Sequence, residues 1–213
     1  MKRRSILQLN IADRQGFLHL SDGSSLDIRS LAWYKNSDGG KDYVSEPFMS
    51  PVLKQLVIAV ITPIMDDNNN HVASLVALLS GLWLSDQIDD IVVGKTGYCY
   101  VLGTTGTTIA ARMTDRVEKM ENVQEMAKKD KKLASLAEFE KIAVEIDDPS
   151  IDFYKYEGIN KIASYATIKS TDWTVIIAAP VNEFMGTVNT LRLSMFIIGA
   201  VILFIAVVVV YLI

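Results

Sequence analysis

The side chains that most often carry out catalysis or hold metals are few and scattered in this chain. The 213 residues include two histidines, His19 and His71, and one cysteine, Cys99. Neither histidine has cysteine partners or an HExxH spacing, so we expect ordinary surface or edge histidines and no metal site. Cys99 lies in an apolar run, which favours a buried small side chain over a disulfide or a metal cluster.

Adjacent acidic pairs are the next candidates, since paired carboxylates can perform general acid–base catalysis. Three such pairs occur, at Asp66–Asp67, Asp89–Asp90 and Asp147–Asp148. Neighbours in sequence point apart on a helix or a strand, so these pairs make poor catalytic dyads. The phosphate-binding motifs GxGxxG and GxxxxGK[ST] and the nucleophile motif GxSxG do not occur either. The sequence therefore predicts no enzyme, no catalytic residue and no cofactor.

The charge balance argues against a nucleic-acid partner. Lys and Arg total 21 against 25 Asp and Glu, for a formal net charge of -4. The basic residues are scattered, apart from short runs in Lys2–Arg4 and Lys128–Lys132. Domains that bind nucleic acid typically carry a basic patch or stripe, so we exclude that class.

The C-terminal segment Leu193–Ile213 contains no charged residue. As a helix it is about 30 Å long, which suffices to cross the hydrocarbon core of a bilayer. A charge at the bilayer centre costs on the order of 3 kcal/mol, so a charge-free run of this length is typical of a membrane span. The sequence predicts one transmembrane helix at 193–213 and a single-pass location in the cell membrane.

The elements of the first half must be short strands joined by polar turns. Alternating apolar residues and a turn at Asp66–Asn70 favour an antiparallel hairpin in the middle of this half. The expected elements are strands at 6–11 and 17–20, a helical turn at 29–36, and strands at 56–64 and 72–84.

Strand signals restart after Gly94, which closes a short helix predicted at 86–93. The expected elements that follow are strands at 97–102 and 107–110, a helical stretch at 122–145 in one or two helices, and strands at 150–156, 161–168 and 173–179. This order predicts an α+β fold of two tandem antiparallel-sheet units rather than one large sheet. The predicted parts are a membrane-distal unit at 1–88, a membrane-proximal unit at 89–182, an exit helix at 183–192 and the transmembrane helix.

Several short motifs between residues 5 and 185 point to a known family. The first unit contains Asp27–Arg29, Trp33–Tyr34 and Tyr43–Phe48, and the second contains Val93–Tyr98, Gly106–Ala110 and Trp173–Ile176 before Pro180. Together they resemble the double Cache sensor domain. In that family each half is a PAS-like antiparallel sheet flanked by helices.

The resemblance implies a function in signal transduction. Double Cache domains form the extracytoplasmic input of methyl-accepting chemotaxis proteins and of some histidine kinases and diguanylate cyclases. It therefore implies a small-molecule sensor on the extracytoplasmic (periplasmic) side of the membrane, in a homodimer joined through the exit and transmembrane helices. Compared with the family, we expect a module truncated at both ends. The alternatives are a remnant that binds no ligand and the input domain of a histidine kinase or diguanylate cyclase.

The resemblance also implies where a ligand would bind. Amino-acid-sensing members resemble one another in an Arg-x-Trp-Tyr run, a Tyr after Glu-Pro and an Asp at the end of the distal sheet. In this chain the Arg position is Leu31, the Tyr position is Phe48 and the Asp region reads Gly81–Leu84. We therefore expect no tight binding of free α-amino acids, unless Arg29 substitutes for the missing arginine. The candidate ligand-binding residues are Arg29, Trp33, Tyr34, Tyr43, Phe48 and Trp83.

Overall fold

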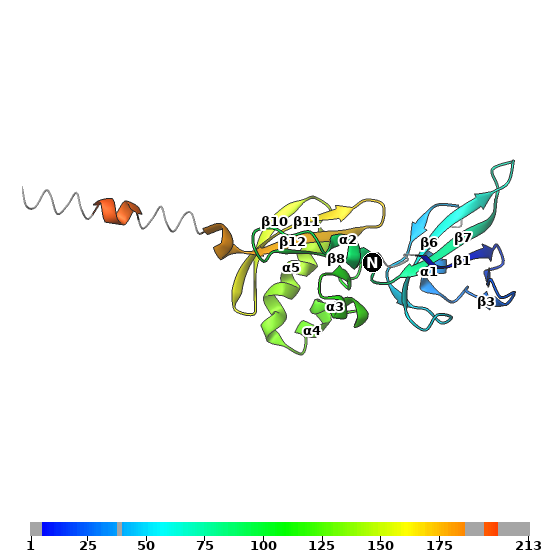
Figure 1. Ribbon diagram of the computed structural model, residues 1–213, viewed down its shortest axis with the longest axis horizontal. Helices are drawn as coiled ribbons and strands as arrows, with labels where there is room; N and C mark the ends of the chain where they lie inside the picture. The colour runs from blue at the N-terminus through cyan, green and yellow to red at the C-terminus, as the bar shows by residue number, and fades with distance from the viewer. Residues whose placement is uncertain (1–5, 38–39, 186–193, 200–213) are drawn as a thin grey trace, which may run out of the picture.

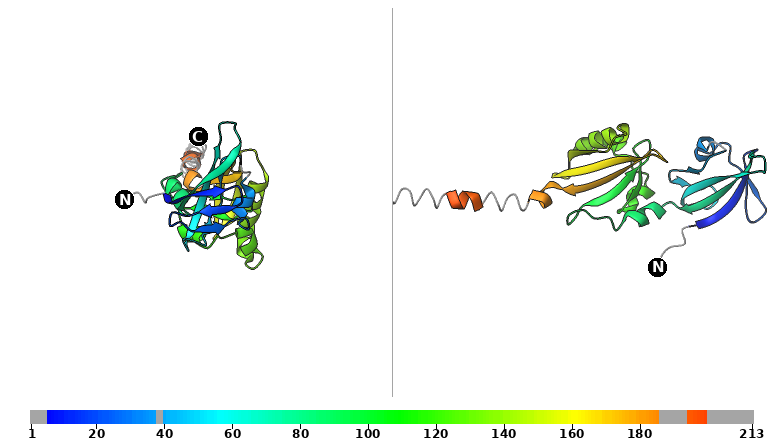
Figure 2. Two further views of the ribbon diagram at one scale, coloured as in Figure 1. Left: turned by 90° about the vertical axis from the view of Figure 1, so that its right-hand side faces the viewer. Right: turned by 90° about the horizontal axis from the view of Figure 1, so that it is seen from above.

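Two antiparallel β-sheets dominate the computed structural model, which describes residues 6–37, 40–185 and 194–199 (Figure 1). The sheets lie one after the other along the long axis of the molecule (Figures 1 and 2). The strands at 56–65 and 173–180 belong to different sheets, so the prediction of two sheets rather than one is confirmed.

The first sheet has the strand order β3-β2-β1-β7-β6-β4, and β5 pairs with β6. Its strands are β1 (Ile6–Asp13), β2 (Phe17–His19), β3 (Ser25–Asp27), β4 (Tyr43–Val44), β5 (Phe48–Met49), β6 (Leu56–Met65) and β7 (His71–Ser80). The predicted hairpin is formed by β6 and β7. In its turn, the Asp66 carboxylate accepts hydrogen bonds from the backbone N–H groups of Asn68 (2.9 Å) and Asn70 (2.7 Å).

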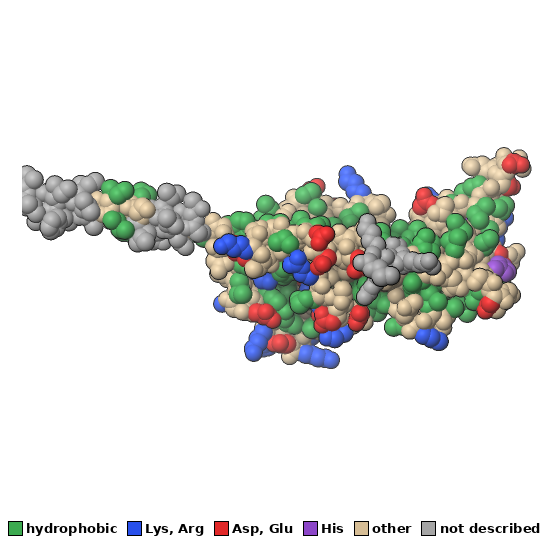
Figure 3. Space-filling model, viewed as in Figure 1, with side chains coloured by type: hydrophobic (Ala, Val, Ile, Leu, Met, Phe, Trp, Pro, Cys, Tyr) green, Lys and Arg blue, Asp and Glu red, His purple; other side chains and the backbone are tan. Residues whose placement is uncertain are grey.

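One short helix, α1 (Ala32–Asn36), lies within the predicted helical turn and covers one face of this sheet. Its Trp33 is buried with Val57, Ile61 and Val76 of the strands below. Hydrophobic side chains are exposed on the surface of this half of the molecule (Figure 3). Among the exposed ones are Leu9 and Ile11 of β1, which alternate along the strand with the buried Asn10 and Ala12.

The second sheet has the order β10-β11-β12-β8-β9. Its strands are β8 (Tyr98–Leu102), β9 (Thr108–Ala111), β10 (Ser150–Tyr156), β11 (Ile159–Ile168) and β12 (Trp173–Pro180). The helices of this half are α2 (Trp83–Ile88), α3 (Thr114–Glu118), α4 (Val123–Ala127), the 3-10 turn η1 (Lys131–Leu133) and α5 (Ala134–Glu145). The longest, α5, packs across the sheet (Figure 2), and the Phe139 ring stacks on Tyr154 with 4.6 Å between centroids.

Two predicted boundaries around Gly81 were wrong. The strand expected to reach residue 84 ends at Ser80, and the helix expected at 86–93 is α2, which begins at Trp83 and ends at Ile88. The Gly81 backbone N–H donates to the Leu56 carbonyl (2.9 Å), and a side chain at Gly81 would collide with Leu56. The chain therefore turns at this glycine, and Ser85 and Ile88 become buried.

Beyond the second sheet, residues 181–185 are helical and leave it at the end remote from the first sheet (Figure 1). The Glu183 carboxylate accepts from the backbone N–H of Lys95 (2.5 Å) and from the Thr96 hydroxyl, which ties this helix to the loop before β8. Most of the predicted exit helix and of the span at 193–213 lies outside the described residues. None of the helices within the described residues has the length and apolar character needed to cross a membrane.

Candidate ligand-binding cavities

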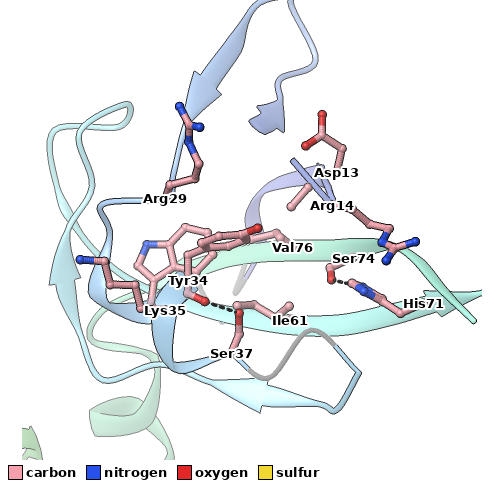
Figure 4. Close-up of a pocket in the computed structure, with 12 residues that line it drawn as sticks. Asp13, Arg14, Arg29, Tyr34, Lys35, Ser37, Ile61, His71, Ser74 and Val76 are labelled. Atoms are coloured by element: carbon pink, nitrogen blue, oxygen red, sulfur yellow. Dashed lines mark hydrogen bonds between the residues drawn. The ribbon is translucent and has the colours of Figure 1, made fainter. Parts of the chain in front are cut away.

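An open cavity of about 350 Å³ lies between α1 and the first sheet (Figure 4). We call it the basic cavity. Sheet residues form its floor and α1 one wall, and its lining comprises Ala12, Asp13, Arg14, Arg29, Trp33, Tyr34, Lys35, Ser37, Ile61, His71, Ser74 and Val76. The floor residues Ile61 and Val76 are apolar and almost completely buried, so the base of the cavity is apolar and the polar lining residues lie around it.

The turn between β1 and β2 shapes one end of the basic cavity. The Asp13 carboxylate accepts from the Phe17 backbone N–H (2.9 Å) and contacts His19 Nε2 (2.8 Å), and both interactions lower the pKa of Asp13. Gly16 has a φ of +85° and lies against the Arg29 side chain and the Tyr34 hydroxyl. A side chain at this glycine would displace Arg29, so the turn holds Arg29 and Tyr34 at the cavity.

Arg29 is already engaged by a neighbouring carboxylate. Its Nε lies 2.9 Å from Asp27 Oδ1 and its Nη2 lies 2.5 Å from Asp27 Oδ2, while the guanidinium lies 5.3 Å from the centre of the Phe17 ring. Hydrogen bonds from Arg29 lower the pKa of Asp27 to about 2. In Figure 4 the Arg29 guanidinium points away from the floor residues Ile61 and Val76. Arg29 therefore does not take the place of the missing Arg-x-Trp-Tyr arginine in this structure.

Two other cations at the basic cavity, Arg14 and Lys35, are not engaged by a carboxylate within the described part of the chain. The side chains of Arg14 and Lys35 make no hydrogen bond or ion pair with any residue that the structure describes. Near Arg14, His71 Nε2 lies 2.9 Å from the Ser74 hydroxyl (Figure 4). With Asp13 as the lining carboxylate, cationic side chains outnumber anionic ones around the cavity, which suits an anionic group of a ligand.

A second, larger space of about 740 Å³ lies between the two sheets. We call it the aromatic cleft, after Trp33, Tyr43, Phe48 and Trp173 in its lining. The rings of Trp33 and Phe48 stack with 5.9 Å between centroids. Trp33 lines both spaces, so its indole is a wall shared by the basic cavity and the aromatic cleft.

The structure divides the predicted site residues between these two spaces. Arg29, Trp33 and Tyr34 line the basic cavity, whereas Tyr43 and Phe48 join Trp33 in the aromatic cleft. Trp83, the sixth predicted residue, lines neither space and begins α2.

Sequence reasoning missed Arg14, Lys35 and Ser74 of the basic cavity. Residues two apart in a strand point to the same face, so Ser74 lies on the same face as the buried Val76. The alternation of the strand could therefore have predicted Ser74 as a lining residue. Arg14 follows the end of a strand and Lys35 lies near the end of a helix. At such positions the sequence pattern does not indicate which way a side chain points.

A separate group of polar side chains is buried beneath α5. Glu140 is fully buried, and its carboxylate has no hydrogen-bond partner among the described residues; the nearest cation is Arg116, whose Nη2 lies 4.0 Å from Oε1. The buried hydroxyls of Tyr100 and Tyr154 likewise make no hydrogen bond with any residue that the structure describes. Burial raises the pKa of Glu140 to about 7, against an opposing effect of Arg116.

Comparison with known proteins places this architecture in a family. A family model described as "Cache domain" matches residues 1–188. No curated protein matches the chain.

Among solved structures, the ligand-binding domain of the Pseudomonas aeruginosa PAO1 amino acid chemoreceptor PctB with L-Gln is 17% identical, with a TM-score of 0.60 over 89% of this chain and 76% of that one. The ligand-binding domain of the Pseudomonas fluorescens chemoreceptor CtaA with L-leucine is 16% identical, with a TM-score of 0.61 over 84% and 72%. The extracellular domain of a candidate histidine kinase, mmHK1S-Z3, is 13% identical, with a TM-score of 0.61 over 89% and 78%. At these identities the likeness shows the shared fold alone.

Proposed function

The chain belongs to the Cache domain family, and from that premise we propose that it is the extracytoplasmic, small-molecule-sensing input module of a methyl-accepting chemotaxis-type receptor. Cache domains are sensory ligand-binding modules. Two of the similar structures are ligand-binding domains of chemoreceptors, which supports the chemotaxis assignment. The likeness to the extracellular domain of a candidate histidine kinase supports a second candidate, the input domain of such a kinase.

The proposal includes the organisation expected from the sequence. The distal unit is residues 1–88, the proximal unit is 89–182, and the exit helix and membrane span follow. The sensor then lies outside the cell membrane, and two copies associate through the exit and transmembrane helices. The charge-free run at 193–213 and the helix at 181–185 support this arrangement.

The observation that carries the sensing function is the basic cavity. It combines an apolar floor with two cations, Arg14 and Lys35, that have no partner among the described residues. Small-molecule sites are typically apolar cavities with a few polar groups that orient the ligand. We infer that the ligand is a small molecule with a carboxylate or another anionic group, and that its apolar part rests on Ile61 and Val76.

The anchors of amino-acid-sensing relatives are apolar here. Leu31 and Phe48 are half-buried and pack against the core that contains Trp33. Gly81 is buried against Leu56, which leaves no room for a side chain there. These observations support a ligand other than a free α-amino acid, because the ammonium group of a zwitterion would lose its hydration without gaining a counter-charge.

Isothermal titration calorimetry tests the proposal on the full chain in maltoside micelles. The panel contains mono- and dicarboxylates such as acetate, lactate and succinate. We expect one class of anion to bind, and the double variant Arg14→Gln/Lys35→Gln to weaken it about tenfold, since each partly exposed charge contributes up to about 1 kcal/mol. Lys155→Gln, which removes an exposed charge on the second sheet, serves as the matched control. Equal affinity of the double variant and the control would show that the cavity is not the site.

A further inference from the structure

The aromatic cleft differs from the basic cavity in the chemistry of its lining. It brings together Trp33, Tyr43 and Phe48 from the first half of the chain and Trp173 from β12. The faces of aromatic rings carry partial negative charge and attract cations, most strongly when the cation is shielded from water. The lining of the cleft thus includes four aromatic side chains at the junction of the two sheets.

The ionisable groups of the cleft are acidic. Glu46 and Asp172 are in its lining, and no Lys, Arg or His is among the lining residues within the part of the chain that the structure describes. Glu46 Oε1 accepts from the backbone N–H (2.7 Å) and the hydroxyl (3.0 Å) of Thr104, which leaves Oε2 available. The Asp172 carboxylate has no hydrogen bond or ion pair with a described residue. The charge of the cleft is therefore opposite to that of the basic cavity.

Trp33 and Thr171, two of the lining residues, each contain a buried polar atom that has no hydrogen-bond partner among the residues that the structure describes. Trp33 Nε1 is a hydrogen-bond donor in a side chain that is only 5% exposed. The Thr171 hydroxyl, next to Asp172, is buried without a partner as well. Buried polar groups are normally satisfied by hydrogen bonds, so an occupant that brings an oxygen acceptor would complete this lining.

From this combination we infer that the aromatic cleft is a second ligand site, distinct from the basic cavity, and that it takes a small organic cation carrying an oxygen acceptor. The ammonium group lies among the rings near Asp172 and Glu46, and the oxygen accepts from Trp33 or Thr171. Trp33 is also a wall of the basic cavity. A ligand in the aromatic cleft and a ligand in the basic cavity would therefore contact the same indole from opposite sides.

Calorimetry on the full chain in maltoside micelles, a detergent without an ammonium group, tests this inference with choline as the probe. The matched control ligand is 3,3-dimethyl-1-butanol, which has the shape of choline without its charge. We expect saturable binding of choline and at least tenfold weaker binding of the neutral alcohol. Since Trp33 and Trp173 are two of the three tryptophans, choline should also shift the tryptophan emission.

Two variants locate the site. Asp172 has a φ of +56°, a conformation that asparagine tolerates well, so Asp172→Asn removes the charge without straining the turn. We expect it to weaken choline binding about fivefold, the upper end for a partly exposed ion pair, and Tyr43→Leu to weaken it by a similar factor. Asp148→Asn, at an exposed position outside the cleft, should have no effect.

The inference is overturned if choline does not bind, if the neutral alcohol binds equally well, or if Asp172→Asn and Asp148→Asn bind choline alike. The variants Arg14→Gln and Lys35→Gln of the basic cavity should leave choline affinity unchanged. The proposal for the aromatic cleft and the proposal for the basic cavity are therefore tested independently of each other.

Discussion

Glu140 should make the stability of this protein depend on pH, and Glu140→Gln should remove most of that dependence. The carboxylate is fully buried between α5 and the second sheet. The groups that face it are Arg116 of α3, Tyr100 of β8 and Tyr154 of β10, with Glu121 close by on the far side of Arg116. Burial raises the pKa of Glu140 from 4.5 to about 7, so the fold holds its proton more tightly than the unfolded chain does.

The sign follows from proton linkage. Below about pH 4.5 the carboxyl group is protonated in both the folded and the unfolded state, so it does not lower the free energy of unfolding. As the pH rises from about 4.5 to about 7, the unfolded chain loses its proton first, so the free energy of unfolding falls. The difference in pKa corresponds to roughly 3 kcal/mol of lost stability above pH 7, since one pKa unit is worth about 1.4 kcal/mol.

Urea unfolding followed by far-UV circular dichroism at pH 5, 6, 7 and 8 measures this effect. Glu140→Gln keeps the size of the side chain and stays neutral, so its free energy of unfolding should lie within about 1 kcal/mol of the native value at pH 5 and exceed it by roughly 3 kcal/mol at pH 8. Arg116 keeps a partner in the variant, because its Nε lies 3.2 Å from Glu121 Oε2. Glu138→Gln, on the exposed face of the same helix, is the control. Parallel pH profiles for the native chain and Glu140→Gln would refute the reasoning.

Three further predictions concern the turn at Gly81, amino-acid binding and the exit helix. Gly81→Ala should lower the free energy of unfolding by about 1–3 kcal/mol in the same urea assay, because a Cβ there meets the Leu56 side chain and the Leu56 backbone carbon at 2.9 Å; an unchanged urea midpoint would contradict this close packing. Free α-amino acids should bind with dissociation constants above about 1 mM by calorimetry, since a buried charge without its partner costs on the order of 2–5 kcal/mol; low-micromolar binding that disappears in Arg29→Ala would overturn this. Single cysteines along 181–192, placed in a Cys99→Ser background, should form disulfides between two copies in membranes, with Asn182, Phe184 and Val188 suited to the contact; no crosslink at any position would argue against a dimer interface there.

The local pattern of the sequence was sufficient for much of the fold. The hairpin around Asp66–Asn70 follows from polar turn residues between two apolar runs, and it depends on contacts within one short stretch of chain. The helical stretch predicted at 122–145 is present as α4, η1 and α5, with Asp130 capping the middle turn. Short motifs spread over both halves indicated the family that the comparison then showed.

The roles of individual side chains at the two cavities depended on tertiary contacts instead. Trp33 was predicted to contact ligand, but its position as a wall between two spaces of opposite charge arises from packing on β6 and β7 on one side and from Phe48 on the other. Asp172 belongs to a turn that is distant in sequence from Tyr43 and Phe48, and only the arrangement of the two sheets brings them to one cleft.

Glu140 shows most clearly the difference between what the local sequence predicts and what the tertiary contacts decide. In the sequence it is one of four charged residues in this helix, and its residue type does not distinguish it from Glu138. Which of the two carboxylates is buried is decided by the rotation of α5 against the sheet, and that rotation is set by the packing of Leu136, Phe139 and Ala143. Periodicity and turn chemistry act over a few residues and can be read along the chain. The electrostatic character of a buried group depends on which distant residues surround it, and that is determined only when the sheet and helix pack together.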